Sequence, residues 1–121
     1  LSPVQYAVPK KSRKDEYRFV KIRDYICDNI TQPITAKDIS RYMFLGEKQI
    51  SRIVREAAGM TAKELVLQLK FQKAKSMLME ERQLSVRQIA EMLGFSSEYY
   101  FNQFFKRMEG YPPGLFRINV R

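Results

Sequence analysis

The chain has 121 residues and a formal net charge of +9, from 22 Lys and Arg residues against 13 Asp and Glu residues. This length suits one domain or two small subdomains, and the charge favours a polyanionic partner such as nucleic acid or an acidic membrane surface. The single Cys and the absence of His exclude an internal disulfide, Cys/His zinc sites, and Ser-His or Cys-His nucleophile pairs.

Residues 1–13 contain two prolines and little apolar periodicity, and a basic cluster runs on to Lys14. This composition predicts a linker or arm. Two roles are open for it: a solvated tether between domains, which we favour, or a basic arm that contacts DNA phosphates. The first residue is Leu1 rather than Met, from which we expect a fragment of a longer protein or a processed chain.

A first helix is predicted over residues 14–30, where apolar side chains recur at helical spacing before Pro33. Thr35 then offers an N-cap, with Asp38 in the first turn of a second helix over residues 36–43. The sequence therefore predicts a longer first helix followed by a short second one.

A turn through Leu45 and Gly46 leads to a third helix, predicted over residues 47–58 and ended by Gly59. A short helix, a turn and a second helix are the anatomy of a helix-turn-helix. We therefore predict a first helix-turn-helix subdomain over residues 14–60.

A long helix is predicted to join the two halves of the chain, over residues 61–80. Thr61 and Glu64 form the capping box that starts it. Twenty helical residues span roughly 30 Å, close to the ~34 Å between successive major grooves on one face of DNA. A linker of that length suits two DNA-contacting units set one groove apart.

The second subdomain is predicted over residues 81–121. Ser85 and Gln88 form another capping box for a helix over residues 86–93, and Gly94 begins the turn. Ser96 or Ser97 caps the next helix, over about 97–108, and a last short helix is predicted around 114–119 after two prolines. Tyr100 and Phe104 are predicted to pack on this last helix through Leu115 and Phe116, although a partner-binding role is also open.

The two subdomains are related by an internal repeat. At an offset of fifty, Ile34, Thr35, Ile39 and Ser40 align with Leu84, Ser85, Ile89 and Ala90. After the turn the offset becomes fifty-one, and Gly59 aligns with Gly110. The second turn is therefore predicted to be one residue longer than the first.

Two helices present polar faces whose residue types suit contact with DNA. The predicted base-facing residues are Lys48, Gln49, Ser51 and Arg52 on the first, and Glu98, Tyr99, Asn102 and Gln103 on the second. Arg pairs with guanine through two hydrogen bonds, and Asn or Gln pairs with adenine. Arg55 and Lys106, a turn further on, are predicted to contact phosphates. A polar face can also be merely solvated, but two matched faces in a basic chain favour DNA contact.

These residues resemble the DNA-binding domain of the AraC/XylS family of bacterial transcription regulators. Its second unit has the pattern I-A-x-x-x-G-F-x-S-x-x-Y-F-x-x-x-F-K-x-x-x-G-x-x-P-x-x-x-R. This pattern is matched by Ile89, Ala90, Gly94, Phe95, Ser97, Tyr100, Phe101, Phe105, Lys106, Gly110, Pro113 and Arg117. The resemblance covers about Tyr17 to Arg117. The chain departs from the family at Gly46, Val54, Leu65 and Lys70, and at Gln103, where many relatives have Arg, which favours adenine over guanine contact.

The resemblance implies an all-α fold of about seven helices, with two helix-turn-helix subdomains joined by a linker helix and two recognition helices in adjacent major grooves. It implies double-stranded DNA and RNA polymerase as partners, in an activator whose N-terminal effector or dimerisation domain lies outside this chain. We predict a cytoplasmic, sequence-specific DNA-binding domain that is not an enzyme, with no cofactor, metal or membrane partner. Two alternatives are a nonspecific nucleic-acid-binding protein and a helical module that binds an acidic protein.

Overall fold

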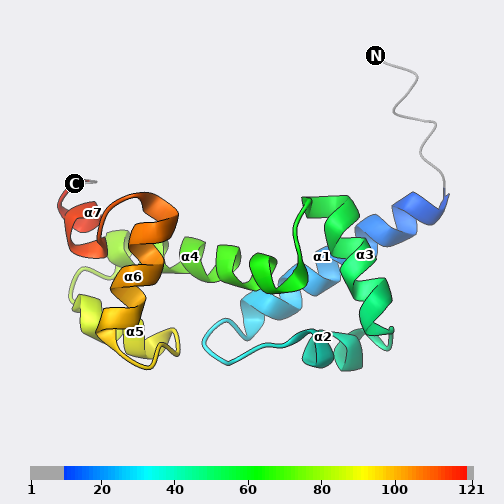
Figure 1. The fold of residues 1–121 in the computed structure, drawn as a ribbon, viewed down its shortest axis with the longest axis horizontal. Coiled ribbons are helices and arrows are strands. Elements are labelled where there is room, and N and C mark those ends of the chain that lie inside the picture. Colours follow the sequence, from blue (N-terminus) through cyan, green and yellow to red (C-terminus); the bar gives the residue numbers. More distant parts are fainter. Residues whose placement is uncertain (1–9, 120–121) are drawn as a thin grey trace, which may run out of the picture. The chain divides into compact units, whose positions relative to one another are not determined.

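Helices make up all the regular structure in residues 10–119, the part of the chain that this computed structural model describes (Figure 1). The predicted all-α fold is confirmed there. Its helices are α1 (Lys10–Asp28), α2 (Ala36–Met43), α3 (Glu47–Ala58), α4 (Ala62–Glu80), α5 (Val86–Met92), α6 (Glu98–Glu109) and α7 (Pro113–Asn119). None of the helices in this part of the chain is long and apolar enough to cross a membrane.

The first helix begins earlier than its apolar pattern suggests. α1 starts at Lys10 rather than at residue 14, so residues 10–13 of the expected arm are helical, and residues 1–9 lie outside the described part. Lys, Ser and Arg can all occur within a helix. The lack of an apolar stripe therefore does not exclude a helix over residues 10–13. The helix ends at Asp28, where Gln32 N–H donates to Asn29 O across a turn at 2.9 Å.

The described residues form two compact units that are not contiguous in the sequence. One unit holds residues 10–28 and Ile34–Leu65, and the other holds Asn29–Pro33 and residues 66–119. The helix α4 therefore begins in the first unit and continues in the second, and the segment between α1 and α2 belongs with the second. The predicted subdomain boundaries, 14–60, 61–80 and 81–121, stay a prediction.

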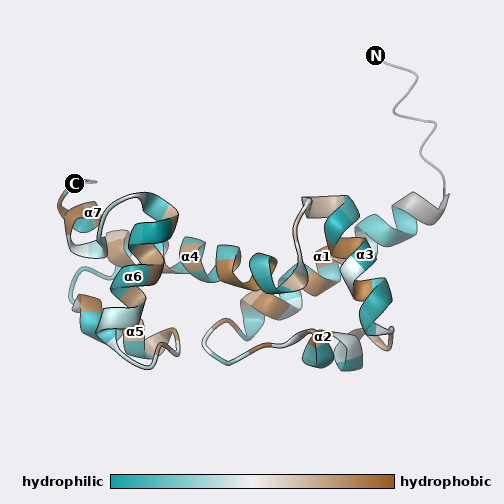
Figure 2. Cartoon of the chain, viewed as in Figure 1, coloured by the Kyte–Doolittle hydropathy of each residue, from teal (hydrophilic) through white to brown (hydrophobic). Residues whose placement is uncertain are grey.

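The first unit is built from α1, α2 and α3, which contact one another pairwise. Its fully buried side chains on these helices are Ile22 and Ile26 of α1, Ile39 of α2, and Ile50, Ile53 and Val54 of α3. Burying a side chain of this size contributes about 1.5–3 kcal/mol. These β-branched residues fall three or four positions apart on their helices, which is why each helix turns one face inward. Figure 2 shows hydrophobic and hydrophilic residues together on each of these helices.

The second unit has an aromatic core to which α4 contributes directly. Phe71 of α4 lies 5.2 Å from Phe105 of α6, between ring centroids, and Phe105 lies 5.3 Å from Phe116 of α7. Ala74 and Leu78 of α4 are fully buried in the same cluster. Most of the predicted linker helix therefore serves as a core element of the second unit.

Two backbone contacts fix loops of the second unit. Gly94, in the turn after α5, has a φ of +83°, and a Cβ there would lie 3.1 Å from Thr31 O. Both the left-handed conformation and the close approach favour glycine. Arg117 of α7 donates from Nε to Leu78 O at 3.0 Å and from its two terminal nitrogens to Leu84 O at 2.6 Å and Glu81 O at 3.2 Å. This guanidinium joins α7 to the end of α4 and the loop before α5.

Candidate nucleic-acid interface

In the first unit, α2 and α3 form a helix-turn-helix with a complete cap at its start. Asp38 N–H donates to Thr35 Oγ1 at 3.2 Å, and Thr35 N–H donates back to Asp38 Oδ2 at 2.9 Å. The hydrogen bond that the Thr35 backbone donates to the carboxylate is the largest cause that holds the pKa of Asp38 below its usual value. In the turn, Leu45 N–H donates to Ser40 O at 3.1 Å. The caps predicted from the sequence are thus present.

The second unit repeats this arrangement with α5 and α6. Ser85 and Gln88 form the predicted capping box, with bonds of 2.8 and 3.0 Å. Phe95 N–H donates to Ala90 O at 3.0 Å, fifty positions after the equivalent bond in the first turn. The N-caps of the following helices, Gly46 and Ser97, are fifty-one positions apart. The second turn is therefore longer by one residue, as the repeat predicts.

The burial of α3 decides which of its residues face solvent. Ile50, Ile53 and Val54 turn into the first unit. The opposite side of the helix exposes four of the five predicted contact residues: Lys48, Gln49, Ser51 and Arg55. Their side chains lie on the solvent side of α3, where a DNA duplex could reach them. That they contact DNA stays a prediction.

Arg52, the fifth predicted residue on α3, is half-buried and ion-paired. Its Nη1 lies 2.8 Å from Asp15 Oδ2 on α1 and 3.2 Å from Glu56 Oε1, one turn further along α3. The hydrogen bond from Arg52 is the main reason why the pKa of Asp15 is lowered and that of Arg52 is raised. A long-range contact to α1 therefore holds this predicted base-contacting side chain.

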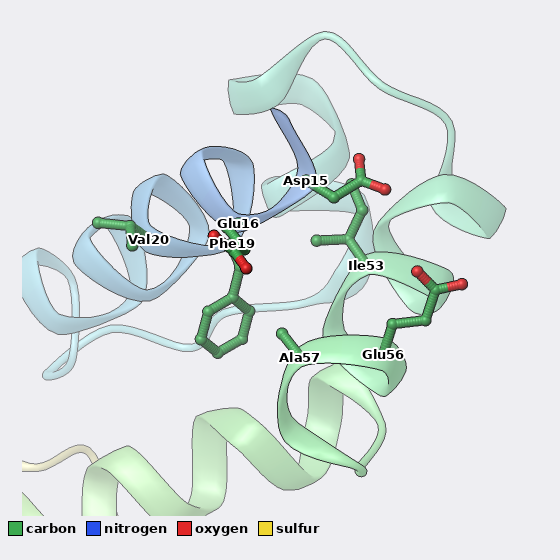
Figure 3. A pocket seen from close by; sticks show the side chains of 7 residues that line it. All are labelled: Asp15, Glu16, Phe19, Val20, Ile53, Glu56 and Ala57. Atoms are coloured by element: carbon green, nitrogen blue, oxygen red, sulfur yellow. The ribbon is translucent and has the colours of Figure 1, made fainter. Parts of the chain in front are cut away.

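Next to this ion pair lies a groove between α1 and α3 (Figure 3). It is lined by Asp15, Glu16, Phe19 and Val20 of α1 and by Ile53, Glu56 and Ala57 of α3. Figure 3 shows Asp15 and Glu56 projecting from facing helices. Three carboxylates make this groove unfavourable for a phosphate. Any DNA contact made by α3 would therefore use the side that carries Lys48 and Arg55.

The burial of α6 is organised in the same way. Phe101, Phe104 and Phe105 are buried. Of the predicted contact residues, Glu98, Tyr99, Gln103 and Lys106 are exposed, and Asn102 is half-buried. The two helices therefore present comparable polar faces on comparable scaffolds.

The predicted packing of Tyr100 and Leu115 is wrong. Tyr100 is 59% exposed and lies against Tyr99 rather than α7, and Leu115 is 50% exposed. Phe104 is buried, but its ring contacts are Phe71 and Phe95. The sequence pattern locates an aromatic face on α6, but it does not show that Phe71 of α4 and Phe95 of the turn contact its rings.

Asp15 is a partner of Arg52 to which the sequence alone does not point. It lies thirty-seven residues from Arg52, in a helix with no motif, and no local spacing connects the two. In the described residues no group of His, Cys, Asp or Glu side chains is placed to hold a metal ion.

Comparison with known proteins identifies the domain type. A family model described as a helix-turn-helix domain matches residues 39–119. The chain is 33% identical to the uncharacterized HTH-type transcriptional regulator YfiF of Bacillus subtilis over 97 residues, which is 80% of this chain and 30% of that protein. It is 29% identical over 111 residues to the probable transcriptional regulator LumQ of Photobacterium leiognathi, covering 92% of this chain and 44% of that protein.

A solved structure of a Chromobacterium violaceum transcriptional regulator, described as AraC-type DNA-binding domain-containing, has the same fold. It superposes with a TM-score of 0.81 at 22% identity, covering 88% of this chain and 94% of that one. The chain spans less than half the length of the two curated relatives. These relatives are transcription regulators rather than enzymes.

Proposed function

Because this chain belongs to the AraC-type helix-turn-helix family of transcription regulators, we propose that it binds a specific double-stranded DNA sequence with α3 and α6 as its recognition helices. Both helices enter major grooves, which have the width to admit an α-helix. We place them in adjacent grooves of one site. The partner is duplex DNA, and a net charge of +9 supplies long-range attraction to it.

The observation that carries this proposal is the pair of matched polar faces. On α3 and α6, apolar side chains turn inward and a row of polar side chains stays at the surface, after turns with equivalent hydrogen bonds. Solvation of a polar face does not require a second helix with the same turn geometry. Contact with two successive grooves requires two such helices.

Each exposed residue has a proposed role that follows from its chemistry. Lys48, Gln49 and Ser51 of α3 face base edges together with Arg52. On α6 that role falls to Glu98, Tyr99, Asn102 and Gln103, where an amide favours adenine. Arg55 and Lys106 contact phosphates, which position the protein without specifying sequence.

Further parts of the proposal concern the full-length protein. We infer that it acts in the bacterial cytoplasm, where the DNA lies, and that it activates transcription through contact with RNA polymerase. An N-terminal domain that senses an effector or dimerises would complete it. The relatives, which are longer than this chain, are the support for that inference.

Equilibrium competition tests the proposal. A labelled duplex selected for binding is displaced by unlabelled copies of itself or by random duplex, and we expect the selected sequence to compete at least ~10³-fold better. Equal competition would mean nonspecific nucleic-acid binding instead. No binding to any duplex at low salt would favour the protein-interaction alternative.

A further inference from the structure

Both carboxylates that hold Arg52 use the same nitrogen of its guanidinium. Nη1 donates to Asp15 Oδ2 at 2.8 Å and to Glu56 Oε1 at 3.2 Å. No other described residue accepts a hydrogen bond from Nη2 or Nε. Because a guanidinium is planar, fixing Nη1 sets the direction in which the other donors point. The Nε and Nη2 edge, which donates no hydrogen bond to a described residue, is the pair of donors that a bidentate contact with guanine or a phosphate requires.

Asp15 is itself held in place. Its side chain is only 12% exposed, and its second oxygen, Oδ1, accepts a hydrogen bond from Arg18 Nη1 at 3.4 Å. The two arginines keep the pKa of Asp15 below its usual range, so the carboxylate is ionised at neutral pH. Glu56 is a weaker support, because its side chain is 62% exposed. Asp15 is thus the fixed end of the network.

We propose that Asp15 of α1 is a positioning residue for sequence recognition, which holds Arg52 so that its Nε and Nη2 edge meets one base pair. The proposal rests on the function proposed above, in which α3 lies in a major groove. Arg loses considerable rotamer freedom when it is ordered at an interface. A side chain already ordered in the free protein avoids part of that loss, so its contact with the right base is stronger.

The charge of Asp15 makes the proposal distinguishable from simpler roles. A carboxylate near DNA repels phosphates, so without a positioning role its removal should strengthen binding to every sequence. If the ion pair only stabilised the fold, its removal should lower the melting temperature and leave the sequence preference of the folded protein unchanged. Positioning predicts a third result, a selective loss at one base pair.

The test compares Asp15→Ala, Arg52→Ala, the double variant and a control. The control is Asp24→Ala, which removes the same charge from the same helix. In the parent, Asp24 lies 3.5 Å from Arg23 and is not paired with Arg52. Dissociation constants are measured for the selected duplex and for duplexes substituted at each base pair, well below the melting temperature of each variant. The base pair that Arg52 contacts is identified as the one whose replacement in the duplex changes the dissociation constant of the parent but not that of Arg52→Ala.

We expect Asp15→Ala to reduce discrimination at that same base pair by about tenfold, within the range of a bidentate contact. The double variant should show no further loss, and Asp24→Ala should keep the parent's discrimination. Asp15→Asn, which keeps an acceptor oxygen but loses the charge, should fall between Asp15→Ala and the parent.

Several results would overturn the inference, and they separate it from the proposed function. If Arg52→Ala lost discrimination but Asp15→Ala kept it, the positioning role would be wrong and the DNA-binding proposal would stand. Stronger binding of Asp15→Ala to all duplexes would show that the carboxylate only repels DNA. A uniform loss in Arg52→Ala would make Arg52 a phosphate contact and remove the basis for positioning. A parent protein that prefers no duplex would refute both proposals.

Discussion

Arg117 offers the sharpest test of how the second unit is held together. Its guanidinium donates to three backbone carbonyls, those of Leu78, Glu81 and Leu84. Leu78 lies in the last turn of α4, where carbonyls have no partner within the helix. Replacing Arg117 by Ala removes the charged donor from all three carbonyls, of which Glu81 O keeps a backbone partner, the N–H of Leu84 at 2.9 Å.

The cost can be worked from the three contacts. The bonds to Leu78 O and Leu84 O are partly buried, whereas the bond to Glu81 O is exposed. Hydrogen bonds from a charged donor contribute about 1.5–3 kcal/mol each. Counting the two partly buried bonds at the low end and neglecting the exposed one gives about 3 kcal/mol. For a unit of this size, that lowers the melting temperature by on the order of 10–20 °C.

Urea denaturation followed by circular dichroism measures this loss for Arg117→Ala. Arg87→Ala is the matched control, because it removes an arginine whose side chain is 74% exposed and whose pairing with Glu91 is weak at 3.7 Å. We expect the control to change the free energy of unfolding by less than about 0.5 kcal/mol. If Arg117→Ala unfolds no more easily than Arg87→Ala, the bonds to the three carbonyls do not stabilise the unit.

Three further predictions concern Phe101, Lys106 and Glu64. Phe101→Ala removes a fully buried ring and should cost about 3–5 kcal/mol; an unchanged urea midpoint would contradict the packing described for α6. Lys106→Ala should weaken binding to all duplexes alike and flatten the log–log salt dependence by about 0.9, whereas an unchanged slope would place Lys106 outside the interface. Hydrogen bonds from Thr61 lower the pKa of Glu64 below its usual 4.5, so its contribution to stability is present above that pH and lost on acidification. Glu64→Gln should therefore show a smaller loss of stability below about pH 4.5 than the parent, and parallel curves would refute this.

Local sequence patterns predicted the helices of this fold well. The predicted bounds of α2 and α3 agree with the structure, since Thr35 caps one and Gly59 ends the other. Capping boxes and glycine stops act within a few residues, so a single sequence contains the whole cause. The hydrophobic pattern does not predict the start of α1, because residues 10–13 carry no apolar side chain.

Contacts between distant segments could not be predicted in this way. Asp15 and Arg52 are brought together only because α1 packs on α3, and Arg117 reaches the end of α4 only after α7 has docked. The family pattern includes Arg117 without indicating what it touches. Exposure was predictable for most of the candidate site because it follows from helical periodicity, but the partners of Arg52 depend on the tertiary structure.

The measurement that tests the central claim most directly is selection of bound sites from random duplex DNA, with the parent and with one variant in each recognition helix. The claim that α3 and α6 occupy successive grooves predicts two blocks of enriched sequence, centred about 10 base pairs apart. Lys48→Ala should erase information in one block and Gln103→Ala in the other. A single block, or the loss of the same positions in both variants, would contradict the account of two recognition helices.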